Sequence, residues 1–165
     1  MKTRLATSLA LAAAVTLGLT GCGLVAPQAT LDPYSPSDGI EVTIADVDVR
    51  NLMLITDAEA RELNVVFTAV NNSQSSQTVG FRFENSKGSS SASADFRLDP
   101  GTTRFGGPEG EATIISMTGV EAGSMITVYV QGAGGDVERQ VPVIDGTLQD
   151  ADGAYAFPEY RELVP

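Results

Sequence analysis

The sequence MITVYVQGAGGDVERQVPV runs from Met125 to Val143 and holds two segments in which apolar and polar residues alternate. A period of two is typical of a β-strand with one buried and one exposed face. The connecting residues 132–136 are mostly glycine, which readily adopts the positive φ angles of a tight hairpin turn. The stretch therefore predicts a β-hairpin. Pro142 has no N–H to donate and indicates an edge position for the return strand.

The same alternation recurs upstream, where turn residues such as Asp99-Pro100-Gly101 separate the segments. Further strands are predicted at 40–44, 47–54, 63–69, 79–83, 94–98 and 113–117. The serine-rich segment 87–93 is expected to be a loop, although an edge strand is also compatible with it. Parallel sheets show continuous apolar runs instead of alternation. We therefore predict an all-β protein, an antiparallel Ig-like or cupredoxin-like β-sandwich of about seven to nine strands.

The first residues have the features of an export signal. Lys2 and Arg4 precede an apolar run, 5–19, of about 15 residues, which is shorter than the ~20 that span a bilayer. Leu19-Thr20-Gly21-Cys22 follows and contains the only cysteine. This motif resembles the lipobox of bacterial lipoproteins. The resemblance implies a signal-peptide helix, cleavage between Gly21 and Cys22, and a covalent diacylglycerol on Cys22. An ordinary secretory signal with a chance cysteine and an uncleaved membrane helix are the alternatives.

Four parts follow from these patterns. Residues 1–21 are the predicted lipoprotein signal peptide, and residues 22–38, which contain several prolines, are a flexible tether. Residues 39–145 form the β-sandwich domain, and 146–165 are an acidic tail with aromatic residues. Two acyl chains on one cysteine hold a protein on a membrane durably. We therefore expect a protein anchored by lipid at the extracytoplasmic face of the cell membrane.

The composition argues against several classes of function. The formal net charge is −11, which repels phosphate backbones, so nucleic-acid binding is not expected. This charge serves solubility or matches a basic partner. No histidine is present, which excludes Ser-His-Asp and Cys-His catalysis and the commonest zinc and copper ligand. An enzyme would need carboxylates alone, as in glycoside hydrolysis. We predict that the protein is not an enzyme and has no cofactor besides the lipid.

The C-terminal tail carries Tyr155, Phe157 and Tyr160 in an otherwise polar setting. Such side chains dock either on their own domain or on a partner. They are therefore the candidate residues for binding a partner.

Three stretches together resemble a known family: residues 37–51, residues 119–123, and residues 141–146. They resemble actinobacterial surface lipoproteins of the LpqE type, which are similar in layout to the periplasmic copper-chaperone domain PCuAC. This resemblance implies a cupredoxin-like β-sandwich. The chaperones bind Cu(I) through histidine and methionine, and the mature chain offers only Met53, Met117 and Met125. Thioether sulfur suits Cu(I), but methionine also fills gaps in apolar cores.

The leading hypothesis is a lipid-anchored, non-enzymatic binding or scaffold protein that acts through contacts with an envelope protein or another envelope component. The alternative is a copper-handling protein with a degenerate, methionine-only site.

Overall fold

The alternating segments form strands in the computed structural model, which describes residues 34, 36–57, 59, 61–108 and 112–165. The expected signal peptide, Gly21, Cys22 and most of the tether lie outside the described residues. Residues 35–165 belong to one compact unit. The elements are β1 (Ile40–Ile44), β2 (Val47–Thr56), β3 (Glu62–Asn71), β4 (Gln77–Glu84), β5 (Ser91–Leu98), β6 (Gly101–Phe105), β7 (Ile114–Ser116), β8 (Met125–Gly132), β9 (Gly135–Asp145) and the short helix α3 (Pro158–Arg161). The all-β prediction is confirmed.

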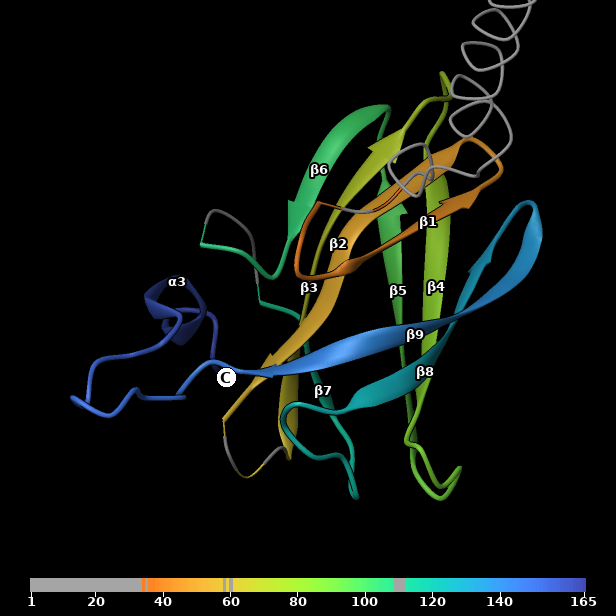
Figure 1. The fold of residues 1–165 in the computed structure, drawn as a ribbon. Helices are drawn as coiled ribbons and strands as arrows, with labels where there is room; N and C mark the ends of the chain where they lie inside the picture. The colour runs from red at the N-terminus through yellow and green to blue at the C-terminus, as the bar shows by residue number, and fades with distance from the viewer. Residues whose placement is uncertain (1–33, 35, 58, 60, 109–111) are drawn as a thin grey trace, which may run out of the picture. The chain divides into compact units, whose positions relative to one another are not determined.

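The strands form two layers that β9 joins (Figure 1). The first sheet contains β1, β2, β3, β6 and β7, and the second contains β5, β4, β8 and β9 in that order. The hairpin of β8 and β9 is present as predicted, with Gly132 opposite Gly135. The last residues of β9, Val143–Asp145, leave β8 and run parallel to Leu54–Thr56 of β2. The sheet is therefore continuous and curled.

Two expectations about pairing need correction. The antiparallel arrangement is correct for every pair among the described strands except β2 with β9, which are parallel because β9 enters the first sheet from the second. The return strand is also not an edge strand, since β9 lies between β8 and β2. Pro142 lies where β9 crosses between the sheets. Val143 donates its N–H to the carbonyl of Ser124, so the backbone nitrogen of position 142 points away from β8. The pairing with β2 begins only at Val143, so no ladder hydrogen bond requires an N–H at position 142.

The main core lies between the two layers and is centred on phenylalanine rings. Phe67 contacts Phe81 and Phe96 in edge-to-face geometry, with centroids 4.9 and 4.7 Å apart, and stacks on Phe105 at 4.7 Å. Such ring pairs add about 0.5–1.5 kcal/mol to the free energy gained by burial alone. The inward-facing apolar residues of the other strands supply the rest of this core. β6 contributes only Phe105, which is partly buried.

Two segments differ from the sequence-based assignment or decide between its alternatives. β6 was not expected, because its only large apolar residue is Phe105. Ser91–Ser93 are part of β5, so the edge strand is the correct alternative for the end of the serine-rich segment. An unbroken ladder to β4, from Glu84 opposite Ser91 to Gln77 opposite Leu98, overrides the weak strand propensity of serine.

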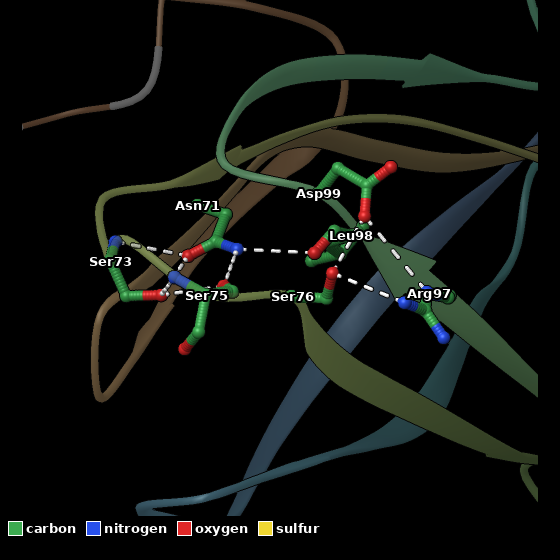
Figure 2. A network of polar contacts seen from close by, with 7 residues as sticks. All are labelled: Asn71, Ser73, Ser75, Ser76, Arg97, Leu98 and Asp99. Atoms are coloured by element: carbon green, nitrogen blue, oxygen red, sulfur yellow. Dashed lines mark hydrogen bonds and ion pairs between the residues drawn. The ribbon is translucent and has the colours of Figure 1, made fainter.

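The polar loop between β3 and β4 is held by one buried amide. Asn71 is 3% exposed, and its Nδ2 donates to the carbonyls of Ser75 and Leu98 at 2.8 and 3.1 Å (Figure 2). Its Oδ1 accepts from the backbone N–H of Ser73 at 3.0 Å. The amide therefore ties the loop and the end of β5 to the first sheet.

Candidate functional site

The C-terminal segment, residues 146–165, lies on the outer face of the first sheet and is drawn in dark blue in Figure 1. Met53 and Ile55 reach this outer face because successive residues of a strand point to opposite sides. Tyr160 and Leu163 pack on them and are only 7% and 8% exposed. We name these residues, together with Val66, the outer cluster. The segment is thus docked on its own domain, and this docking shapes the site described below.

A short helix presents the aromatic side chains of the segment. Pro158 opens α3, where its missing N–H costs nothing, and Glu159 and Arg161 match the dipole of the helix at its two ends. Tyr160, on this helix, faces the sheet, and the ring of Phe157 lies beside it with centroids 5.7 Å apart. The buried tyrosine supports the more exposed phenylalanine.

A second buried amide clamps the segment to the sheet. Asn64 on β3 is 2% exposed, and its Nδ2 donates to the carbonyl of Leu163 and to that of Gly106, both at 2.9 Å. Its Oδ1 accepts from the N–H of Thr113 at 3.2 Å. Because every polar atom of the amide is used, the last turn of the chain is held in one place.

The segment leaves β9 through a close contact that only glycine permits. A Cβ at Gly146 would lie 2.5 Å from Cγ2 of Val164 and 2.7 Å from the carbonyl oxygen of Tyr160. The N–H of Gly146 donates to the carbonyl of Thr56 at 2.9 Å, which extends the β2–β9 ladder by one bond. The beginning and the end of the segment are therefore packed against each other.

The hydroxyl of Tyr160 donates to the carboxylate of Asp38, just before β1. Burial of the ring, and then the hydrogen bond to Asp38, raise the pKa of the Tyr160 hydroxyl far above its ordinary value. The proton of this hydroxyl is therefore retained well into the alkaline range. The bond closes one side of a groove.

The groove, which we call the tail groove, has a volume of about 430 Å³ and lies where β9 passes from the second sheet to the first. It is lined by Asp38, Ala122, Gly123, Ser124, Met125, Pro142, Val143, Ile144, Asp145, Leu148, Phe157 and Tyr160. Met125, Leu148 and Phe157 are 46%, 49% and 41% exposed. The wall is therefore mainly apolar and open to solvent.

Among the described residues, only two charged ones line the tail groove, and both are acidic. Asp38 accepts from Tyr160, and Asp145 accepts from both the N–H and the hydroxyl of Thr147 at 2.8 and 2.7 Å. In the described part of the chain, no lysine or arginine lines it. A groove with an apolar wall and carboxylates at its edge favours a ligand in which an apolar group lies next to a positive charge.

The candidate residues for partner binding have different surroundings in the structure. Tyr160 is buried, whereas Phe157 faces the tail groove. Tyr155 is 40% exposed, lies under the guanidinium of Arg161 at 5.6 Å, and does not line the groove. The sequence pattern did not identify Leu148, whose only signal was an apolar side chain in a polar segment.

The three methionines have three different environments. Met53 lies in the outer cluster, and Met117 is buried in the main core between the sheets. Met125 opens β8 and faces the tail groove. The structure does not bring the three sulfur atoms to one site.

The carboxylates of the described residues are distributed over the surface. The buried polar residues are Thr56, Asn64, Asn71 and Asn85, with no Asp or Glu among them. Asp48, on the exposed face of β2, accepts a hydrogen bond from Thr43 at 2.8 Å, and this bond, with help from Asn72 and Arg50, lowers its pKa. Within the described ranges, no three acidic, thiol or imidazole side chains are grouped as metal ligands.

Within the part of the chain that the structure describes, no helix combines the length and the apolar character that crossing a bilayer requires. Comparison with known proteins gives no family: no protein-family model matches the sequence, and no curated protein matches it. The class of the protein is therefore defined by its fold, an all-β domain of two joined sheets with a docked C-terminal segment.

Proposed function

We propose that this is a lipid-anchored, non-enzymatic binding protein of the extracytoplasmic membrane face, which holds a basic segment of an envelope protein in the tail groove. An apolar side chain of that partner fills the groove, and neighbouring cationic side chains meet Asp38 and Asp145. The function is recognition, and the lipid on Cys22 keeps the domain at the membrane.

The observation that carries the proposal is the gathering of exposed apolar side chains at one place. Three of the six large hydrophobic residues that are exposed in the described chain, Met125, Leu148 and Phe157, line the same groove. Isolated exposed hydrophobics are ordinary, but a contiguous apolar patch with a polar rim is typical of an interaction site. Methionine and phenylalanine are also the residue types enriched in protein interfaces.

The charge of the chain supports a basic partner. The formal net charge is −11, and the described lining of the tail groove contributes two carboxylates and no cation to the interface. Complementary charge accelerates association and selects against acidic competitors. The acidic groove disfavours an anionic lipid headgroup for the same reason.

The lipobox-like motif supports the proposed location. Asp38 follows Cys22 by a tether of about 16 residues, whose r.m.s. reach is roughly 20–25 Å. A partner of the tail groove is then a protein at or near the same membrane. The resemblance to LpqE-type lipoproteins is consistent with this location. We do not propose copper handling, because Met53 and Met117 fill separate apolar clusters.

The test is site-specific photo-crosslinking in intact envelopes. A photoreactive residue at position 148 should give a discrete protein adduct, whereas the same residue at position 136 should not, because Asp136 is also exposed but lies outside the tail groove. Phe157→Ala should remove the adduct, and the adducted protein should be basic. Equal adducts from both positions, or an adduct that does not depend on Phe157, would overturn the proposal.

A further inference from the structure

One edge of the second sheet has no partner strand among the described residues. β5 pairs through one side with β4 over its whole length and ends the strand order there. Its other side therefore presents the outward-pointing backbone N–H and C=O groups of alternate residues between Ser91 and Arg97, whereas the carbonyl of Leu98 accepts from Asn71. Such an edge is a template on which another strand can form a ladder.

Four devices that often protect an edge strand, namely proline, lysine, a bulge and a very short length, are missing from β5. The strand SASADFRL contains no proline and no lysine, and its ladder to β4 shows no bulge. It is also regular over eight consecutive residue pairs. Natural proteins interrupt free edges with prolines, lysines, bulges or very short strands. An edge without them is suited to pairing.

A groove lies along this edge. It has a volume of about 490 Å³ and includes three successive residues of β5, Asp95, Phe96 and Arg97. Arg104 and Phe105 of β6 and residues 112–114 form its opposite side. Space for an added chain is therefore located at the C-terminal half of β5.

The charges on β5 favour one particular occupant. Asp95 and Arg97 are both exposed and, two residues apart, point to the same outer face of the sheet. In an antiparallel pair of two β5 strands centred on Phe96, Asp95 of each copy lies directly opposite Arg97 of the other. Cross-strand pairs of opposite charge stabilise a sheet, and pairs of like charge destabilise it.

We propose that a second copy of this chain occupies the edge, so that two molecules pair through antiparallel β5 strands centred on Phe96. The second sheets of the two copies then join into one sheet across a two-fold axis, and the pair of β5 strands makes two Asp95–Arg97 contacts. Moving the centre by one residue would place Asp95 opposite Asp95, which the charges oppose. The groove and the charge pattern thus indicate the same centre.

The present contacts of Arg97 are compatible with this pairing. Its Nη2 donates to the hydroxyl of Ser76 at 3.3 Å, and its Nε lies 3.9 Å from the carboxylate of Asp99 (Figure 2). The side chain is 77% exposed, and a guanidinium carries five N–H donors. Enough donors face solvent for a carboxylate of a second copy.

Anchoring would strengthen the association. Two chains held on one membrane meet at a much higher effective concentration than in solution. A modest ladder of a few residues therefore suffices where both copies are acylated. This inference does not depend on the tail groove, which uses other residues.

Charge exchange provides the test. The full mature chain is purified in mild detergent, and its dimer dissociation constant is measured by sedimentation. Asp95→Arg and Arg97→Asp should each weaken self-association about tenfold or more, because each creates two like-charge pairs. The double variant Asp95→Arg/Arg97→Asp should restore association. An equimolar mixture of the two single variants should also form a heterodimer, in which every pair is again opposite in charge.

The mixture also controls for folding, because two misfolded variants would not restore each other. A wild-type chain that stays monomeric at high micromolar concentration would overturn the proposal. Single variants that associate like the wild type would do so as well, as would a double variant or a mixture that stays dissociated. Association that persists in every variant would assign the contact to another surface.

Discussion

The hydroxyl of Tyr160 donates a hydrogen bond to the carboxylate of Asp38, across 122 positions of the sequence. This bond joins helix α3 to a residue just before β1, beside the tail groove. It also gives the folded state a dependence on alkaline pH. In the unfolded chain a tyrosine ionises near its ordinary pKa of about 10, whereas the folded state keeps the proton on Tyr160 to higher pH.

We expect the stability contributed by Tyr160 to be complete below pH ~10 and to fall as the pH rises further, because only the unfolded chain gains free energy by ionising. Tyr160→Phe should lower stability at neutral pH by about 1 kcal/mol through the lost hydrogen bond. Its free energy of unfolding should then depend less on pH above 10 than that of the wild type. Parallel pH profiles for the two proteins, measured by urea unfolding, would contradict this explanation.

Gly146→Ala should displace the C-terminal segment. The added Cβ would meet Val164 and the carbonyl of Tyr160 at 2.5 and 2.7 Å, and such overpacking costs about 1–3 kcal/mol. Gly107→Ala is the matched control, because no atom lies within 4 Å of a Cβ there. Limited proteolysis should cut the segment faster in Gly146→Ala only. Equal cleavage of both variants would show that the contact at Gly146 does not hold the segment.

Asn64→Ala should be the most destabilising change to a polar residue in the outer region. It leaves the carbonyls of Leu163 and Gly106 and the N–H of Thr113 without their partner, at a cost of about 2–4 kcal/mol. Asn72→Ala, at an exposed position, should change stability by less than about 0.5 kcal/mol. Thermal unfolding compares the two, and similar melting temperatures would argue against the clamp.

Ala45→Gly should stabilise the domain. Ala45 lies in the turn between β1 and β2 with φ of 49°, a left-handed conformation that an alanine adopts at a cost and a glycine does not. We expect a gain of up to about 1 kcal/mol, reduced by the greater freedom of glycine in the unfolded chain. Denaturant titration provides the measurement. A loss of stability would show that the turn tolerates Ala45 without strain.

Cys22→Ser should release the protein from the membrane or block its maturation. Without the thiol no diacylglyceryl group can be attached, and the apolar run 5–19 is too short to serve as an ordinary membrane span. Fractionation and intact-protein mass measurement provide the readout. An unchanged membrane fraction with an unchanged mass would refute the assignment of the lipobox.

Every strand except β6 was predictable, because apolar and polar residues alternate along its own sequence. Val79, Phe81 and Phe83 are buried on β4, and the residues between them are the more exposed or the smaller ones. β6 escaped prediction because an edge segment that buries little has no such pattern. Ser91–Ser93 became strand through the ladder to β4, which no local property of serine predicts.

The candidate site was predictable only in part. The aromatic residues of the tail are visible in the sequence, but nothing local distinguishes buried Tyr160 from exposed Phe157. That distinction depends on Asn64, Gly146 and the outer face of β2, which lie far from the tail in sequence. Leu148 is a candidate site residue because it lines the same groove as Met125, and no pattern in the sequence predicts that these two residues are close.

The sequence by itself determined the strands other than β6 and the start of β5, the face that each of them buries, the acidity of the chain, the absence of histidine and the lipobox-like motif, since all of these are local properties. Only the tertiary structure decided that β9 runs parallel to β2, that the C-terminal segment covers an outer face, and that Met125, Leu148 and Phe157 share one groove. The reason is physical: the alternation of apolar and polar residues predicts which side chains are buried. Which residues a buried side chain contacts depends instead on how distant parts of the chain pack together.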